Sequence, residues 1–389
     1  MKLEKDLIIL LKMTLQRNNN LIWKLRKVIF KNDNNLKGSI PFCNSLLLDE
    51  QLSNENSIVS ILINHTEVSL IYIDYNEIKL NFDFEFWYNN LINENYREEH
   101  VKPISAKLPF HYHYIPAKIR NFIASKIITD EIKKYPSNLL DFSVQRIINI
   151  IGKKYSEAPL LVLTHDIDSA KGFNYIEDII SIEEKYKLKS SWNVVPDLYK
   201  IDHKILSNLF NNGFEIGLHG LRHDNNEAFM SYKKFKYNLD LHSGFINKYE
   251  IKGYRGPSWY RTKSLMKVLS ENFQYDLSCL DNDVICPGGK GGVGTMNPFK
   301  FENGLIELPC TIPFETPILL NMVNQEDIVE YWKNKVNFII QNNCMLLINT
   351  HPDPNYLGNK KMLDLYDEFL SFVSSYNWNH KLPSEILVK

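Results

Sequence analysis

The stretch LLVLTHDID, residues Leu160–Asp168, is an apolar run that ends abruptly in two carboxylates. It is short and hydrophobic enough to form a buried strand. Residues two apart in an extended chain point to the same side, so this strand would deliver Asp166 and Asp168 to one place. In α/β proteins the carboxyl ends of strands are where ligands bind and catalysis occurs. Because neighbouring acids repel each other, we expect a positive group beside them.

Three later apolar runs share this property, since each ends in an ionisable side chain. They are FEIGL (Phe214–Leu218) before His219, IKGY (Ile251–Tyr254) before Arg255, and CMLLINT (Cys344–Thr350) before His351. His223 follows His219 by four residues, a spacing that lets both rings direct a nitrogen at one ion. One carboxylate and two imidazoles leave coordination positions open for water and substrate, as a catalytic metal site requires.

In this order the motifs THDID, HGLRH, RGPSW and LINTH resemble the polysaccharide deacetylases with the NodB-homology fold, carbohydrate esterase family 4. The resemblance covers the chain from Pro159 to its C-terminus. Each motif alone is common, so the resemblance depends on their order and on their positions at strand ends. The usual first motif of the family has adjacent aspartates, whereas Ile167 separates them here, and some branches of the family carry this Asp-x-Asp form.

The resemblance implies a metal-dependent deacetylase site. Asp166 would be the general base that takes a proton from a metal-bound water. Arg255 would hold this base ionised and oriented, because an adjacent cation lowers the pKa of a carboxylate. Asp168, His219 and His223 would hold the divalent metal. Zinc suits this set of ligands best, and cobalt, iron or nickel would also fit.

The resemblance also assigns roles further along the chain. His351 would be the general acid that protonates the leaving amine, and Asp276 lies in YDLS, which is similar to a weaker catalytic motif of the family. Trp259 and Tyr260 are expected either to stack on a sugar ring or to lie in the core. Amide hydrolysis needs an activated water, a polarised carbonyl and a protonated leaving nitrogen, which a metal and an imidazolium can supply.

Each of these residues also has an ordinary structural explanation. Acids commonly end a strand or cap a helix, and the two histidines could lie on the exposed start of a helix. Arg255 and His351 both stand close to a proline, where loop residues are frequent, and Asp276 could be a simple turn residue. We favour the chemical interpretation because it accounts for all of the motifs at once.

The pattern after residue 159 predicts the fold class. Apolar runs alternate with helical periodicity, which indicates an α/β protein with a parallel sheet. With candidate site groups at successive strand ends, we expect a distorted, incomplete (β/α) barrel of the NodB-homology type. The expected helices are Phe173–Leu188, His203–Asn212, Tyr232–Tyr249, Thr262–Phe273, Glu326–Asn342 and Met362–Tyr376.

We expect two parts in the chain: an N-terminal α+β region of unknown role over residues 1–150, and the catalytic domain over residues 151–389. His111 and His113, in an aromatic stretch of the first part, are interpreted as loop or core residues. The elements expected in the first part are two paired strands, Ser57–Ile63 and Val68–Ile73, and two helices, Ala117–Lys134 and Leu139–Lys154.

Composition sets the outer limits. The chain has 389 residues, of which 44% are hydrophobic and 23% charged, as in ordinary soluble globular proteins. Its net charge of −1 gives no reason to expect a nucleic acid or an acidic membrane as a partner. Five cysteines without a Cys-x-x-Cys spacing predict free, mostly buried thiols. Neither a signal-peptide core nor a transmembrane run is recognisable, so we expect a cytoplasmic location, and the oligomeric state stays open.

One motif is rejected. The stretch GGKGGVGT, Gly288–Thr295, resembles a phosphate-binding loop, but Gly294 stands where such a loop needs a lysine. Pro298 soon follows and argues against the helix that such a loop must open. We interpret the stretch as a surface loop.

These patterns favour a metal-dependent hydrolase that removes N-acetyl groups from an amino-sugar-containing glycan or glycan precursor. An N-acetylated carbohydrate would then be its substrate. Two alternatives from other classes stay open. One is a non-catalytic carbohydrate-binding relative, and the other is a non-haem iron oxygenase, because one Asp and two His also bind iron in those enzymes.

Overall fold

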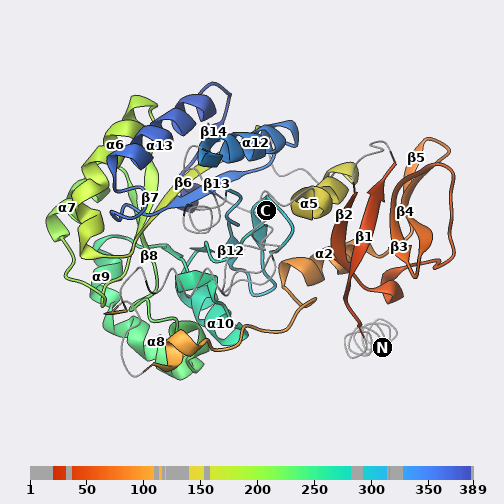
Figure 1. Ribbon diagram of the computed structural model, residues 1–389. Helices are drawn as coiled ribbons and strands as arrows, with labels where there is room; N and C mark the ends of the chain where they lie inside the picture. The colour runs from red at the N-terminus through yellow and green to blue at the C-terminus, as the bar shows by residue number, and fades with distance from the viewer. Residues whose placement is uncertain are drawn as a thin grey trace, which may run out of the picture.

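The structure is a computed structural model that describes residues 21–31, 37–108, 114–115, 119, 140–152, 158–281, 292–312, 315 and 327–386. It contains two sheets, one in the N-terminal region and one in the region of the strand-end motifs (Figure 1). Several expectations lie outside the described residues. They are the helix over Ala117–Lys134 (apart from residue 119), His111, His113, Cys286 and the first half of the glycine-rich stretch.

The N-terminal sheet is antiparallel throughout, with the strand order β2-β1-β3-β4-β5. The expected pairing of Ser57–Ile63 with Val68–Ile73 is confirmed, because β3 pairs with β4. The elements of this region are β1 (Lys24–Phe30), β2 (Lys37–Phe42), β3 (Ser57–Ile63), β4 (Thr66–Asp74), β5 (Glu77–Leu80), α2 (Phe84–Ile92), η2 (Ile104–Lys107) and α5 (Leu140–Ile150).

The core of the N-terminal sheet extends into the second region. Its buried members include Val144 and Ile147 of α5, and also Cys279, Val293 and Phe299 from the later part of the chain. The two sheets are therefore joined by packed apolar side chains. Asp83 begins α2 as its N-cap, since its side chain accepts a hydrogen bond from the backbone N–H of Phe86 at 3.1 Å. The division into residues 1–150 and 151–389 stays a prediction.

The second sheet has the order β11-β12-β10-β9-β8-β7-β6-β13, with β14 also beside β6, and it is parallel except for the pair β11–β12. This confirms the α/β fold class. All eight residues of β6 are buried, as expected of a strand covered on both faces. The strands are β6 (Leu160–Ile167), β7 (Ser190–Val194), β8 (Glu215–Leu218), β9 (Gly253–Tyr254), β10 (Tyr275–Asp276), β11 (Phe299–Lys300), β12 (Ile306–Glu307), β13 (Leu346–Thr350) and β14 (Asn379–His380).

This sheet curls until its two ends meet. Two isolated parallel bridges follow β12. Cys310 pairs with Leu280, which lies in the chain after β10, and Ile312 pairs with Ile348 of β13. The backbone N–H of Thr311 donates to the carbonyl of Leu347 at 3.1 Å. The closing side consists of two-residue ladders and isolated bridges, so the expected distorted, incomplete barrel is confirmed.

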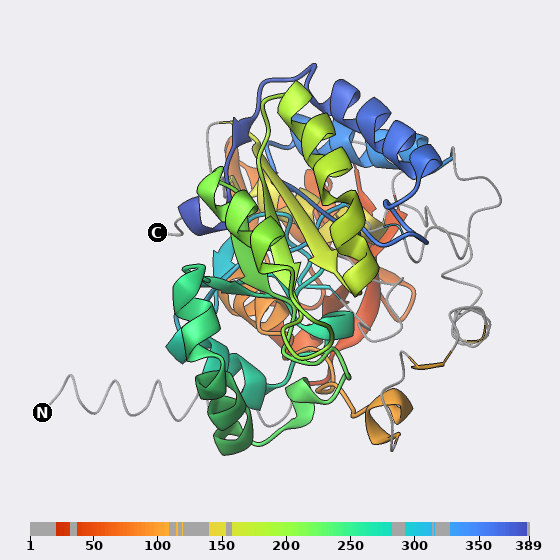
Figure 2. The same ribbon diagram turned by 90° about the vertical axis from the view of Figure 1, so that its left-hand side faces the viewer.

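Helices surround the barrel on its outer side (Figures 1 and 2). Two expected helices differ from those observed. The prediction of a single helix over Tyr232–Tyr249 is wrong. The helix is interrupted at His242, beside Ser243 and Gly244, which have low helix propensity. The helix expected from Phe173 begins only at Ile176, after a 3-10 turn. The helices among the described residues are η4 (Ala170–Tyr175), α6 (Ile176–Lys185), α7 (His203–Asn211), η5 (Glu227–Phe229), α8 (Tyr232–Leu241), α9 (Ser243–Lys248), η6 (Pro257–Trp259), α10 (Lys263–Asn272), α12 (Asp327–Gln341), α13 (Lys360–Val373) and η7 (Pro383–Glu385).

Two further expectations concern the described part of the chain. Its four cysteines, Cys43, Cys279, Cys310 and Cys344, are free and buried, as expected. None of the helices in the described ranges is long and apolar enough to cross a membrane.

Candidate metal centre

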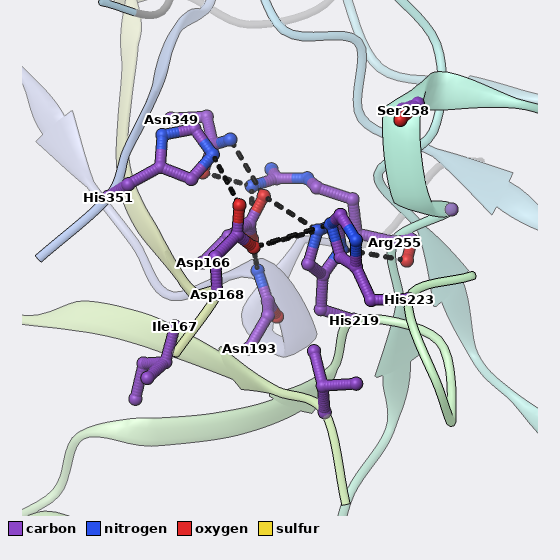
Figure 3. A network of polar contacts seen from close by, with 12 residues as sticks. Asp166, Ile167, Asp168, Asn193, His219, His223, Arg255, Ser258, Asn349 and His351 are labelled. Atoms are coloured by element: carbon purple, nitrogen blue, oxygen red, sulfur yellow. Dashed lines mark hydrogen bonds and ion pairs between the residues drawn. The ribbon is translucent and has the colours of Figure 1, made fainter. Parts of the chain in front are cut away.

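The ends of the parallel strands bring the motif residues together. Asp166 lies near the end of β6 and Asp168 just beyond it, while His219 follows β8, Arg255 follows β9 and His351 follows β13. Because these strands are parallel neighbours, their carboxyl ends lie at one edge of the barrel. Figure 3 shows the five side chains around one small space, with His219 and His223 facing the two carboxylates.

Three of these side chains could hold a metal ion. Asp168 Oδ1 lies 3.5 Å from His219 Nε2 and 3.4 Å from His223 Nε2. Ligand atoms of a tetrahedral zinc site, each about 2.0–2.1 Å from the ion, lie about 3.3 Å apart. Both distances from Asp168 Oδ1 thus match those of a metal site, and ligand atoms of Asp168, His219 and His223 all lie within 4.8 Å of one another.

His219 is oriented by its other ring nitrogen. Its Nδ1 lies 3.2 Å from the backbone carbonyl of Arg255, which can only accept, so Nδ1 carries the proton and Nε2 faces the site. Burial lowers the pKa of His219 to about 4, with the neighbouring His223 acting in the same direction. The ring is therefore neutral at ordinary pH, which is the form that binds a metal.

The loop that carries the two histidines is held by Glu227, which the sequence analysis did not select. Its carboxylate accepts hydrogen bonds from the backbone N–H groups of Leu221 and Arg222 at 2.6–2.9 Å. Gly220 has a φ of +64°, and a Cβ there would lie only 2.6 Å from Glu227 Oε2. A glycine is therefore required between the two histidines. Burial raises the pKa of Glu227 to about 7.

Asp166 is a buried carboxylate with three hydrogen-bond donors around it. Oδ1 accepts from Asn193 Nδ2 at 2.8 Å and from Arg255 Nη1 at 3.0 Å, and Oδ2 accepts from Asn349 Nδ2 at 2.7 Å. Burial alone would raise the pKa of Asp166, but the charge of Arg255, aided by His219 and His351, lowers it below its usual range. Asp166 is therefore ionised at neutral pH, with its Oδ2 3.8 Å from His219 Nε2.

Arg255 is fully buried and is bonded through each of its three nitrogens. Nη1 also donates to Asn349 Oδ1, Nη2 donates to Thr164 Oγ1 at 3.0 Å, and Nε donates to the carbonyl of Leu277 at 3.2 Å. The ring of Trp259 lies 5.2 Å from the guanidinium carbon, within the range of a cation–π contact. These contacts come from β6, β13, the residue after β10 and η6, and they fix the guanidinium beside Asp166.

His351 lies on the opposite side of the site from the histidine loop (Figure 3). Its Nε2 is 4.0 Å from Asp168 Oδ2, and its Nδ1 is 3.3 Å from Glu315 Oε2. The other oxygen of Glu315 accepts the backbone N–H of His351 at 2.6 Å. Burial alone would lower the pKa of His351, but the charge and hydrogen bond of Glu315, together with Asp168 and Asp166, raise it to about 10.

Asp353 holds the backbone at Asp168 in place. Its Oδ2 accepts the backbone N–H of Asp168 at 3.1 Å, and its Oδ1 accepts the hydroxyl of Ser169. Burial and the nearby charge of Asp168 raise the pKa of Asp353 to about 7. Asp353 stands two residues after His351 in the sequence, but only the folded chain brings it to the end of β6.

The remaining predicted residues lie around this centre. Asp276 is buried in β10, where it accepts the Ser278 hydroxyl at 2.6 Å and hydrogen-bonds with Glu307, and burial raises its pKa. Trp259 is only 4% exposed, so its ring is packed over Arg255 and does not form an open platform. Tyr260 is half-buried, and its ring contacts His100 and Phe229 edge-on.

Asn193, Asn349, Glu227, Glu315 and Asp353 were not selected from the sequence. Asn349 stands within LINTH, so its place at a strand end was a usable signal. Glu315 belongs to none of the sequence motifs, and nothing in the sequence around it marks it. Its contact with His351 exists only because the chain beyond β12 closes the barrel next to β13.

No family model and no curated protein matches the chain. Solved structures do match. A protein from Mycobacterium smegmatis described as a polysaccharide deacetylase is 16% identical, over 58% of this chain and 91% of that one, with a TM-score of 0.45. An allantoinase, Puue, is 13% identical over 58% of this chain and 88% of its own, with a TM-score of 0.47. A CE4 family pseudoenzyme from Bacillus anthracis is 13% identical over 59% of this chain and 66% of its own, with a TM-score of 0.40.

The matches thus include polysaccharide deacetylases and a member of the CE4 family, the family that the sequence motifs resemble. They also include an allantoinase and a pseudoenzyme. With TM-scores below 0.5, they decide neither the reaction nor the substrate. The functional argument therefore depends on the geometry of this chain's own residues.

Proposed function

We propose that the protein is a metal-dependent hydrolase that removes N-acetyl groups from an amino-sugar-containing glycan or glycan precursor. One observation carries the proposal. The metal-type group Asp168, His219 and His223 has two functional groups beside it: the ionised carboxylate of Asp166, 3.8 Å from His219 Nε2, and the protonated imidazole of His351, 4.0 Å from Asp168 Oδ2. A base and an acid close to one metal site are what hydrolysis of an amide requires.

In this proposal Asp168, His219 and His223 hold a divalent metal, with zinc the first choice by ligand chemistry. Such an ion would polarise the amide carbonyl and lower the pKa of a bound water. Asp166 accepts the proton of the attacking water. The Arg255 cation and the amides of Asn193 and Asn349 keep this carboxylate ionised and correctly turned.

His351 gives its proton to the departing nitrogen. An amine anion is a poor leaving group, so protonation has to accompany C–N cleavage. Glu315 supports this role in two ways: it accepts the backbone N–H of His351, and its other oxygen, 3.3 Å from Nδ1, favours the charged imidazolium. We assign the reaction to residues 151–389 and propose that Trp259 acts through Arg255, while Tyr260 borders the substrate.

Two other functions can be separated from this one. An iron oxygenase would also use one Asp and two His, but it needs neither a base nor a proton donor in these positions. Acetate release without oxygen would exclude it. A carbohydrate-binding protein would bind sugar and metal without turnover, and it would not need Asp166 for binding.

The direct test is an acetate-release assay under anaerobic conditions with N-acetylated sugar nucleotides, chitooligosaccharides and peptidoglycan fragments, with bound metal measured in the same samples. Wild type should release acetate from at least one of these classes, and Asp166→Asn should not do so at a comparable rate. Sugar binding by both proteins, without acetate from either, would contradict the proposal.

A further inference from the structure

The chain that follows α2 contributes to the loops of the candidate metal centre. After α2 the segment Glu94–Ser105 leaves the N-terminal sheet and runs past the start of α10 (Figure 1, orange). The Glu99 carboxylate accepts the backbone N–H of Lys263, the first residue of α10, at 2.7 Å. The His100 ring accepts the backbone N–H of Arg261 at 3.0 Å and contacts Tyr260 edge-on. We call Glu94–Ser105 the linking segment.

Glu94 forms a buried ion pair with Arg261 of the catalytic part. Arg261 Nε donates to Glu94 Oε2 at 2.7 Å, and Nη2 donates to Oε1, so the pair is bidentate. The side chains are 4% and 13% exposed. Arg97 Nη2 donates to the same carboxylate at 2.7 Å. Because a buried guanidinium needs a counter-charge, Glu94 determines where Arg261 can lie.

Arg261 in turn holds the turn that follows Arg255. Its Nη1 donates to the carbonyl of Trp259 at 2.9 Å and to that of Ser278 at 2.8 Å. Ser258 and Trp259 have φ values of +51° and +62°, the left-handed region that side chains other than glycine rarely adopt. Such a turn persists only where its surroundings hold it. The Trp259 ring that it positions lies against the Arg255 guanidinium.

A second contact joins the linking segment to the histidine loop. Asn225, two residues after His223, donates from Nδ2 to Ser105 Oγ at 3.2 Å and accepts the Ser258 hydroxyl on Oδ1 at 2.9 Å. Both His223 and Asn225 have positive φ values, +52° and +58°. One amide therefore connects the histidine loop, the strained turn and the N-terminal region.

We propose that Glu94 is a positioning residue of the active site, which acts through Arg261 to hold the Ser258–Trp259 turn and with it Arg255. The N-terminal region thereby completes the catalytic centre. This inference rests on the proposed function, because it names a residue for the same reaction. It also makes a claim about the turn that can be measured without any activity.

The main variant is Glu94→Gln, which removes the charge and keeps the shape. Its matched control is Glu98→Gln, a glutamate in the same segment with an exposed side chain. We expect Glu94→Gln to lower kcat by about 10-fold to 100-fold with little change in KM, because small displacements of catalytic groups cost this much. Glu98→Gln should match wild type.

Hydrogen exchange supplies the measurement that is independent of turnover. The amides of Trp259, Tyr260 and Arg261 are bonded within the turn or to His100. They should exchange faster in Glu94→Gln than in wild type or Glu98→Gln, while amides of β6 and β13 stay protected. If wild type released no acetate, the proposed function would fail, and this exchange difference would still decide the inference.

Two further comparisons separate positioning from plain stability. Glu94→Asp keeps the charge and should recover part of the lost kcat. In an Arg261→Gln background, Glu94→Gln should add little to the loss, because both changes interrupt the same connection. Should Glu94→Gln not fold, the double variant Glu94→Gln/Arg261→Gln, which leaves neither charge buried alone, carries the exchange measurement. Unchanged exchange in the turn, or a kcat equal to that of Glu98→Gln, would overturn the inference.

Discussion

The carboxylate of Glu315 lies 3.3 Å from Nδ1 of His351 and also accepts the backbone N–H of that residue. The pair joins the closing side of the barrel to the end of β13. It holds the imidazole with Nε2 toward Asp168, and it makes the charged ring the stable form. The charge state of His351, the proposed general acid, therefore depends on a residue far from every sequence motif.

We expect Glu315→Gln to lower the pKa of His351, which is about 10 in the intact protein, because a negative charge beside the ring is lost. A general acid must be protonated, so the basic limb of the pH–rate profile should move to lower pH. The profile of kcat/KM against pH measures this directly. A basic limb that stays in place would show that His351 is not the acid or that Glu315 does not control it.

Removing a metal ligand should remove the metal. His219→Ala should bind far less zinc or cobalt than wild type, because two of the three ligand atoms cannot retain the ion tightly. Equilibrium dialysis followed by elemental analysis measures this, with His242→Ala as the control, because His242 is a half-buried histidine that contacts Asp197 and none of the candidate ligands. A full equivalent of metal in His219→Ala would mean that the ion is held elsewhere.

Asp166→Asn tests the base. The amide keeps the size of the side chain and can still contact Asn193 and Asn349 after reorientation, so metal content and fold should be retained. The rate should fall by about 10²-fold or more, the scale of general-base removal. Metal analysis and acetate release on the same sample give both quantities. Loss of the metal together with the rate would make Asp166 a ligand.

Arg255→Met tests the cation beside the base. The base must be ionised to work, and removal of the guanidinium should raise the pKa of Asp166, which is held low by that charge. The acid limb of the pH–rate profile should therefore move to higher pH. Arg255→Lys, which keeps a charge but not the fork of donors, should move it less. An unmoved acid limb in Arg255→Met would place the role of Arg255 outside the base.

His351→Ala should discriminate between leaving groups. An amine leaves poorly without a proton, whereas an activated phenolate leaves readily. Cleavage of an N-acetyl sugar should therefore be crippled and cleavage of an aryl acetate impaired much less, with metal content unchanged. Equal losses on both substrates, with the metal retained, would mean that His351 stabilises the oxyanion or positions the sugar.

Much of the candidate site could be predicted from the sequence, because it depends on local patterns. An apolar run ending in Asp166 and Asp168 predicts both a strand and the side to which the two acids point, and β6 has both properties. The four-residue spacing of His219 and His223 likewise predicted that both rings can point at one site, and each ring lies within 3.5 Å of Asp168 Oδ1. Helix boundaries were less accessible, since the break at His242 depends on weak propensities and on packing.

By itself the sequence predicted β3, β4, β6, β8, β9 and β13 and the residues that follow the last four, because periodicity and spacing act within a few residues. The choice of Asp168, His219 and His223 as metal ligands came from the family resemblance. Only the tertiary structure decided which carboxylate faces His351 and which one balances Arg261. Glu315 reaches the site because the barrel closes, and Glu94 reaches it because the chain after α2 crosses to α10. Those contacts depend on burial and charge compensation between segments far apart in the chain, which no local pattern records.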